Sequence, residues 1–245
     1  MLISILITTE NPPDDDLPAR VAENIQSFKR AYPDMEHRLF DNDQIRSLIA
    51  DKFDHEVLKA YDALRPFAFK SDLARLCLLS VFGGIYADLG CFFVQKWAPY
   101  ELELKQPEPR LWVFGDFVSA APWDTSQSVV GAPKGHKALT KAIELICGHV
   151  KDRYYGPTVL CPTGPTCFGK AVALSCEPED LMVGFSQVIT QDHLPGLVTE
   201  RSHGFIMGVD VIAVKRKRTT SLQELGITNG NDYLPAWCEK QVYND

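Results

Sequence analysis

The chain has 245 residues, 45% of them hydrophobic and 23% charged, which is ordinary for a globular protein and long enough to bury a sizeable core. The formal net charge of −7 argues against nucleic acid as a partner, because phosphate binding needs a broad basic surface. The seven cysteines include no Cys-x-x-Cys pair, so no zinc site is indicated and a reducing compartment is favoured. We expect one domain that covers residues 1–245.

The first predicted elements alternate between strands and helices. An aliphatic run at residues 2–7 predicts a strand covered on both faces, and it is too short to span a bilayer. Helical spacing follows over residues 20–30, then a strand over residues 37–40, then a helix that begins at Asp41 or Asn42. This order is typical of a nucleotide-binding α/β domain.

A central helix and strand hold the groups most suited to chemistry. Apolar residues at helical spacing over 73–82 predict a helix with one apolar face, which Gly83 and Gly84 end. A short strand over 85–87 then leads to Asp88 at its carboxyl end. Ligands of open α/β sheets collect beyond such strand ends, so we expect a site at Asp88.

Two further side chains are predicted to reach this site from the helix. Asp72 and Arg75 lie three residues apart and therefore share one edge of the helix. Carboxylate and guanidinium groups bind sugar hydroxyls through charge-assisted hydrogen bonds, and Arg75 can also approach phosphate. The alternative is an exposed ion pair worth only about 0.3 kcal/mol. Tyr86 either offers its hydroxyl to the pocket or belongs to the core.

The second half of the chain continues the alternation. We expect strands at residues 91–94, 111–114, 183–189 and 205–214, and helices at residues 139–150 and 231–243. A basic run at residues 215–218 is most simply a solvated face, and the alternative is contact with a diphosphate or an anionic membrane surface. Trp237 either docks into the core or stacks on a sugar or base.

The central segment resembles the signature of glycosyltransferase family 32. That signature reads roughly Ser-Asp-hydrophobic-x-Arg, a helix, and then Gly-Gly-hydrophobic-Tyr-hydrophobic-Asp-x-Asp. Residues 71–75 and 83–88 match it position by position, whereas Gly90 stands where the second Asp of the DXD motif usually lies. The family includes yeast initiating mannosyltransferases, bacterial polysaccharide transferases and, more distantly, clostridial glucosylating toxins.

Two later stretches strengthen the resemblance. Residues 127–136 resemble a family motif that begins with asparagine, and Gln127 provides an amide at that position on a longer side chain. Thr163, Gly164 and Pro165 resemble the family's turn that opens a helix. Thr163 is predicted to N-cap that helix and to leave amide N–H groups aimed at an anionic or hydroxyl-rich ligand, or to be a capping turn and nothing more.

The resemblance implies a GT-A type, Rossmann-like nucleotide-sugar-binding fold with a mixed central sheet. It implies transfer of a hexose from a UDP- or GDP-linked donor to a saccharide or glycolipid acceptor, with retention and without a protein nucleophile. Two alternatives stay open. One is a non-catalytic nucleotide-sugar-binding protein with a degraded metal site, and the other is an unrelated α/β nucleotide-binding enzyme.

Site residues follow from the same resemblance. The catalytic candidates are Asp88 and Arg75. In the family the end of the first strand receives the nucleotide base, which makes Thr8 and Thr9 candidates, and the alternative is that both are plain turn residues. The predicted donor-binding residues are Thr8, Asp72, Arg75, Gly84, Tyr86, Asp88, Gln127, Thr163 and Gly164.

The resemblance also implies a divalent metal, Mn²⁺ or Mg²⁺, at Asp88. Gly90 cannot supply the second carboxylate, so three outcomes are open. They are a weaker site completed by a distant carboxylate or carbonyl, a metal-free site using Arg75 and residues 215–218, and an inactive binder. A retained but weaker metal site is the favoured expectation, because Mg²⁺ keeps several water ligands.

Location is predicted from the first residues and the basic run. Eukaryotic members usually carry a membrane anchor, which is not evident here. This favours a bacterial-type cytoplasmic enzyme of polysaccharide or glycoconjugate synthesis, or a chain whose anchor has been removed. Peripheral association with the inner face of the membrane is an allowed variant.

Overall fold

The computed structural model describes residues 1–7, 17–96, 103, 106, 109–116, 121–192, 194–195, 202–215 and 233–244. In chain order the elements are β1 (Leu2–Ile5), α1 (Ala19–Ala31), β2 (His37–Phe40), α2 (Asn42–Lys52), α3 (His55–Ala63), α4 (Phe67–Phe82), β3 (Gly84–Ala87), β4 (Cys91–Phe93), β5 (Leu111–Asp116), β6 (Thr125–Ala132), α6 (Lys137–Lys151), α7 (Pro165–Ser175), β7 (Leu181–Ile189), β8 (Ser202–Met207), β9 (Asp210–Lys215) and α8 (Tyr233–Cys238).

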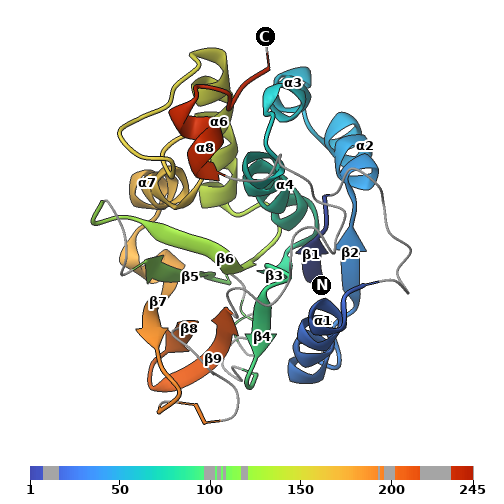
Figure 1. Ribbon diagram of the computed structural model, residues 1–245, viewed down its shortest axis with the longest axis vertical. Helices are drawn as coiled ribbons and strands as arrows, with labels where there is room; N and C mark the ends of the chain where they lie inside the picture. The colour runs from blue at the N-terminus through green and yellow to red at the C-terminus, as the bar shows by residue number, and fades with distance from the viewer. Residues whose placement is uncertain are drawn as a thin grey trace.

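These strands form one mixed sheet in the order β2-β1-β3-β6-β5-β7-β8-β9-β4 (Figure 1). The strands β2, β1 and β3 are parallel, and β6 runs antiparallel to β3. Every connection within the parallel part passes through a helix, as parallel strands require. The expected α/β fold with a mixed central sheet is confirmed.

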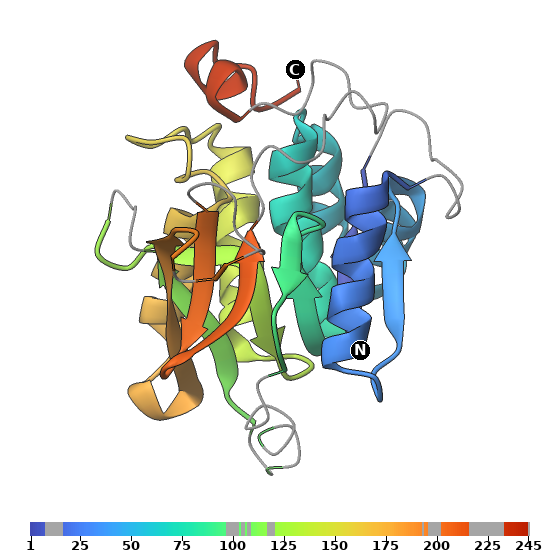
Figure 2. The ribbon, with the colours of Figure 1, turned by 60° about the horizontal axis from the view of Figure 1, so that its bottom comes forward.

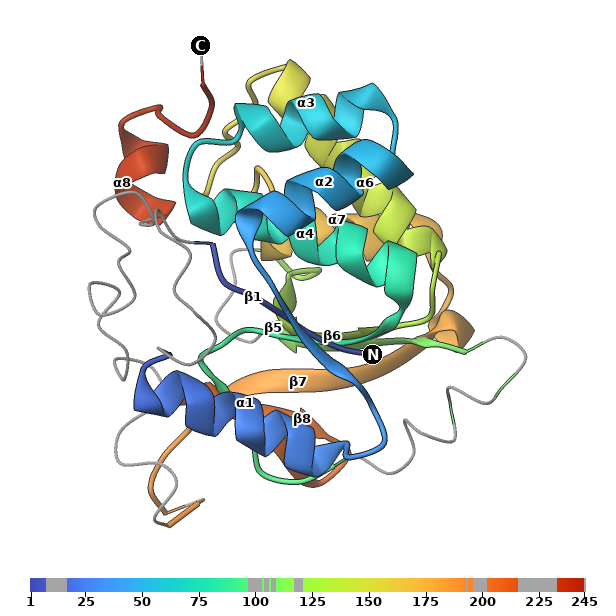
Figure 3. The same ribbon diagram turned by 90° about the vertical axis from the view of Figure 1, so that its right-hand side faces the viewer.

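The helices cover the sheet unequally. Figure 3 shows α2, α3, α4, α6 and α7 on one face and α1 on the other. The sheet curls, so its last strand, β4, returns beside α1, where the rings of Phe28 and Phe93 stack 4.4 Å apart. Figure 2 shows β9 in orange beside β4 in green, with α1 in blue beyond. This curl brings the ends of β3 and β9, far apart in the chain, to one place.

Helix α4 is buried around its whole circumference at its centre. Residues 72–79 are all buried, whereas the spacing predicted a helix with a single apolar face. The reason is tertiary, because α4 lies between the sheet and the helices α3 and α6, which pack on its outer side. Asp72 and Arg75 are therefore interior residues, 1% and 6% exposed, and the exposed ion pair considered above is wrong.

Two glycines turn the chain from α4 into β3, as predicted. Gly83 ends the helix with a φ of 63°, and its N–H donates to Leu79 O. Gly84 follows with a φ of 109° and packs directly against the backbone of Met1. It begins β3, at the end opposite Asp88, so its predicted role in donor binding is replaced by a packing role.

Gly84→Ala is expected to lower the free energy of unfolding by about 3 kcal/mol. The added methyl would overlap the carbonyl oxygen of Met1 and would occupy a positive φ. Gly135→Ala is the matched control, because Gly135 has a φ of 71° and no described residue comes within 4 Å of its missing Cβ. Gly135→Ala should lower the free energy of unfolding by about 1 kcal/mol, which is the cost of placing a side chain at a positive φ. Urea unfolding measures both, and equal losses would contradict the packing role.

Other elements differ from the prediction in detail. Helix α3 was not predicted, although Asp54 caps it by accepting the N–H groups of Glu56 and Val57. The single strand expected over 205–214 is the hairpin β8–β9, because Gly208 at a φ of 63° turns the chain. Of the two predicted starts of α2, Asp41 or Asn42, the structure shows Asp41 as the N-cap, as part of a capping box.

The C-terminal residues pack on the helical layer. The Trp237 indole N–H donates to Tyr155 O at 2.9 Å, and the ring packs against the main core. Docking is therefore the observed role of Trp237, not stacking on a ligand. Among the described residues, none of the helices combines the length and hydrophobicity needed to cross a membrane.

Candidate functional site

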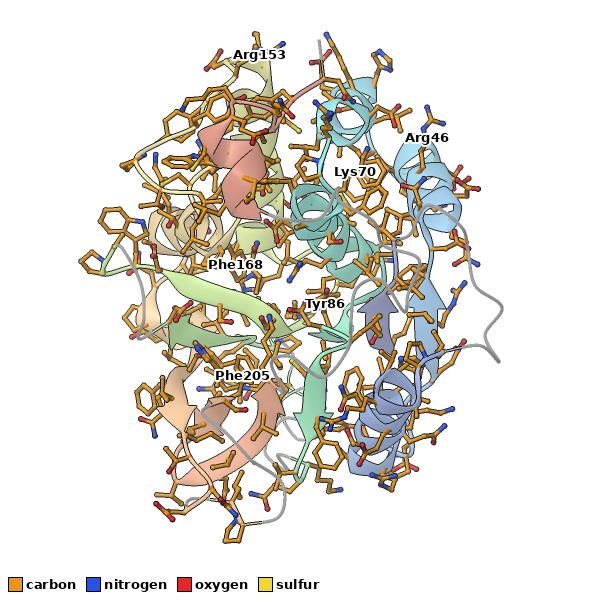
Figure 4. The ribbon with its side chains drawn as sticks, in the orientation of Figure 1. Arg46, Lys70, Tyr86, Arg153, Phe168 and Phe205 are labelled. Atoms are coloured by element: carbon orange, nitrogen blue, oxygen red, sulfur yellow. The ribbon has the colours of Figure 1, made fainter. Side chains whose placement is uncertain are left out.

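A cavity of about 500 Å³ opens at the carboxyl ends of β1 and β3. This size suits a small-molecule ligand. The helix α4 forms one wall and the strands β5 to β9 form the other, with Tyr86 near the middle and Phe205 on the strand side (Figure 4). Its polar lining residues are Ser71, Asp72, Arg75, Tyr86, Asp88, Asp116, Ser126, Gln127, Ser128, Ser186, His203 and Lys215.

Arg75 contacts several polar groups of this lining at once. One of its terminal nitrogens donates to Asp88 Oδ1 at 3.1 Å and to the Gln127 carbonyl at 2.6 Å. The other terminal nitrogen lies 3.1 Å from Asp72 Oδ1, and Nε donates to the Ser71 carbonyl at 3.0 Å. A planar guanidinium with these partners is fixed in one orientation. It also covers the face of the Tyr86 ring at 4.7 Å.

Asp88 receives donors on both carboxylate oxygens. Oδ1 accepts from Arg75 and, at 2.8 Å, from the Tyr86 hydroxyl, while Oδ2 accepts from Lys215 Nζ at 2.8 Å. Burial raises the pKa of Asp88, but the charges of Lys215 and Arg75 and these hydrogen bonds outweigh burial and hold the pKa well below 3.8. Asp88 is therefore a carboxylate throughout the neutral range.

Lys215 is not among the predicted donor-binding residues, and the sequence offered it only as part of the basic run 215–218, the alternative source of cations for a diphosphate. Lys215 ends β9 opposite Cys91 of β4, and its ammonium bridges Asp88 Oδ2 and Ser128 Oγ at 2.8 Å each. Burial lowers the pKa of Lys215, but Asp88 more than offsets this and raises the pKa above 10.5. The solvated-face prediction is thus wrong for Lys215, and residues 216–218 lie outside the described residues. Ser128 was not predicted either, and the sequence carries no signal for it.

Asp72 is held from the far side by Thr163. The Thr163 hydroxyl donates to Asp72 Oδ2 at 2.7 Å, whereas the N-cap of α7 is Gly164 and has no side-chain cap. The predicted N-cap role of Thr163 is therefore wrong, because its hydroxyl serves a buried carboxylate instead. Gln127 Nε2 donates to the Thr163 carbonyl at 3.4 Å, and Gln127 Oε1 has no partner within the described part of the chain.

The predicted site residues fall into four groups. Asp72, Arg75, Tyr86, Asp88 and Gln127 line the cavity together. Thr163 and Gly164 lie behind Asp72, and a Cβ on Gly164 would come within 3.6 Å of Asp72 Oδ2. Gly84 lies at the other end of β3, away from the cavity. Thr8 and Thr9 lie outside the described residues.

The residues around Asp88 do not fit a divalent metal of the expected kind. Both Asp88 oxygens already accept from N–H or O–H groups, and two of these donors are cations. Gly90 adds no ligand. Across the described residues, no three His, Cys, Asp or Glu side chains group so that they could hold a metal ion. A hard cation needs several oxygen ligands with unshared lone pairs directed at it.

Residues 18–106 match the family described as "Glycosyltransferase sugar-binding region containing DXD motif". The uncharacterized glycosyltransferase L373 of Acanthamoeba polyphaga mimivirus is 29% identical over 75 residues, which are 31% of this chain and 30% of L373. HOC1 of Saccharomyces cerevisiae, whose name also contains the word glycosyltransferase, is 33% identical over 146 residues, which are 54% of this chain and 37% of HOC1.

Among solved structures, the protein named PaToxG Glycosyltransferase has a similar fold. The TM-score is 0.50 and the identity 16%, over 71% of this chain and 67% of that one. At this identity the likeness shows the fold alone. The chain spans about a third of the length of the two curated relatives, 30% and 37%.

Proposed function

We propose that the chain transfers a hexose from a nucleotide-sugar, on the premise that residues 18–106 match the glycosyltransferase sugar-binding region that contains the DXD motif. The donor is UDP- or GDP-linked, and the acceptor is a saccharide or a glycolipid in polysaccharide or glycoconjugate synthesis. The observation that carries this proposal is the cluster of Asp72, Arg75, Asp88 and Lys215 in one cavity at the strand ends.

The cluster offers both kinds of group that a nucleotide-sugar needs. Asp88, whose side chain is 22% exposed, can accept a further hydrogen bond from a sugar hydroxyl, because a carboxylate has about four lone-pair sites and three donors contact it here. Arg75 and Lys215 bring positive charge toward a diphosphate. Their orientations are fixed before any ligand arrives, so little reorganisation is needed on binding.

The transfer exchanges one bond at the anomeric carbon for another. The bond to the β-phosphate oxygen breaks with its electron pair going to that oxygen, and the acceptor hydroxyl oxygen bonds to the same carbon. The hydroxyl proton passes to the departing diphosphate. We propose retention of configuration, with the acceptor entering on the side from which the diphosphate leaves. No cysteine attack is invoked, since burial raises the pKa of the nearby Cys91 thiol to about 12.

The test of this function is a thermal-shift panel with UDP-glucose, GDP-mannose and NAD. A ligand that binds only the folded state stabilises it by about 2.7 kcal/mol at a hundred times its dissociation constant. One of the two nucleotide-sugars should raise the melting temperature, whereas NAD, whose diphosphate carries no hexose joined through its anomeric carbon, should not. A shift with NAD alone would favour an unrelated nucleotide-binding enzyme.

A second candidate is a nucleotide-sugar-binding protein without catalysis. The observation favouring it is Gly90, which leaves the DXD motif incomplete. The two candidates differ in one readout, because a binder would raise its melting temperature with a nucleotide-sugar and release no nucleoside diphosphate. Chromatographic detection of UDP or GDP after incubation separates them.

We also propose that residues 1–245 act as one domain in the cytoplasm, with access to the inner face of the membrane. The cysteines support the reducing compartment, because all seven are free thiols, four of them buried. Fractionation of cells that express the tagged chain tests this location.

A further inference from the structure

We propose that the Lys215 ammonium takes the place of the divalent metal ion, so that this chain acts on its donor without metal. The inference rests on the proposed function and deepens it by naming the cation at the site. Lys215 is then a catalytic residue that contacts the donor diphosphate.

The first support is where the ammonium lies. Lys215 Nζ is 2.8 Å from Asp88 Oδ2, the carboxylate of the incomplete DXD motif. Its second partner among the described residues is the hydroxyl Ser128 Oγ, so these two contacts use two of the three ammonium N–H groups and a diphosphate oxygen can accept from the third. The Lys215 side chain is 33% exposed and lines the cavity, so a bound diphosphate can reach it.

The second support is the environment of Gly90. Gly90 does not have a positive φ, and among the described residues a Cβ built there would meet the Cγ of Lys215 alone, at 3.9 Å. Neither backbone strain nor crowding therefore requires glycine at this position. What lies beside the missing side chain is the stem of Lys215, so one cation-bearing side chain stands where a metal-binding carboxylate would project.

The third support is the charge around Asp88. A divalent ion on Oδ2 would have to displace the ammonium that already holds this oxygen, and it would lie next to the guanidinium of Arg75. Two like charges at such separation repel strongly when water is partly excluded. The two carboxylates Asp72 and Asp88 balance Arg75 and Lys215 in number, so these four paired groups are neutral together without a further cation.

The role of Lys215 follows from the bond that breaks. As the electron pair moves onto the β-phosphate oxygen, negative charge grows on the diphosphate. An ammonium and a guanidinium already aimed at this place stabilise that charge, which is the contribution a metal ion would otherwise make. Asp88 acts as a positioning residue, because it holds both cations and stays ionised.

Isothermal titration of Mn²⁺ tests the site without any donor. Wild type should show no binding, because the ammonium occupies Asp88. The variant Gly90→Asp combined with Lys215→Met restores the carboxylate pair and removes the ammonium, so it should bind Mn²⁺ at least roughly tenfold more tightly. Lys141→Met is the matched control, since Lys141 pairs with Glu144 on the surface of α6 and should behave as wild type. Wild-type Mn²⁺ binding as tight as that of the double variant overturns the proposal.

Release of UDP or GDP from UDP-glucose or GDP-mannose provides the second arm. Wild-type turnover should be the same in EDTA and in Mn²⁺, and Lys215→Met should lower it by roughly 10²- to 10³-fold while Lys215→Arg retains more. Turnover that EDTA abolishes and Mn²⁺ restores overturns the proposal. If neither sugar nucleotide shifts the melting temperature or is turned over, the proposed function fails, and the Mn²⁺ titration still decides whether Lys215 replaces the metal.

Discussion

Arg75→Ala is expected to lower the free energy of unfolding by about 3–5 kcal/mol and to abolish donor turnover. The guanidinium is 6% exposed and is the shared partner of Asp72 and Asp88. Its removal leaves Asp72, itself 1% exposed, without its cation inside the protein. A buried charge that loses its partner keeps the full cost of having left water. Urea unfolding measures this loss as a lower midpoint with an unchanged m-value.

The control for this substitution is an arginine with the same type of partner at the surface. Arg46 makes a bidentate ion pair with Asp62, but the two side chains are 51% and 40% exposed, and Figure 4 shows Arg46 at the outer side of α2. Arg46→Ala should leave the urea midpoint nearly unchanged, because water screens an exposed pair. A wild-type midpoint for Arg75→Ala would contradict the interior network.

Asp88→Asn is expected to reduce donor turnover by roughly 10²-fold or more and to remove part of the protein's acid sensitivity. The pKa of Asp88 is depressed in the folded state by Lys215 and Arg75. Its ionised form therefore contributes stability that is fully present above the unfolded-state pKa of about 3.9 and is lost as the pH falls toward the folded-state pKa. Asparagine does not titrate, so it lacks this contribution.

The difference in unfolding free energy between wild type and Asp88→Asn should therefore depend on pH. We expect about 3 kcal/mol near pH 7 and a progressive decrease below about pH 4. Urea unfolding of both proteins across this range measures it. Asp180→Asn is the control, since Asp180 pairs with Lys137 at the surface and should change little. A difference that stayed constant with pH would show that the two cations do not hold Asp88 ionised.

Local features of the sequence were sufficient for most elements and for the core of the site. The strand β2, the helix α1 and the cap at Asp41 follow from periodicity and from side chains adjacent to the backbone groups they bind. Asp72, Arg75 and Asp88 could be predicted together for the same reason. Asp72 and Arg75 lie within one turn of the helix α4. Asp88 directly follows the strand β3, which begins at the tight turn after that helix.

The tertiary structure alone decided what these three residues contact. Thr163 reaches Asp72 across 91 residues, and Lys215 reaches Asp88 across 127. Neither partner has a local signature, since a threonine beside a glycine also suits a cap and a lysine in a basic run also suits a solvated face. Likewise, the burial of α4 on all sides depends on α3 and α6 and not on its own spacing.

The physical reason is the range over which each kind of regularity acts. Backbone geometry repeats within a helix or a strand, so residues a few positions apart have fixed relative places that spacing reveals. The order β2-β1-β3-β6-β5-β7-β8-β9-β4 is instead fixed by how whole faces pack, and it alone brings β9 back to β4 beside the end of β3. The sequence by itself therefore determined which carboxylates and guanidinium form the site, and the curl of the sheet decided that an ammonium completes it.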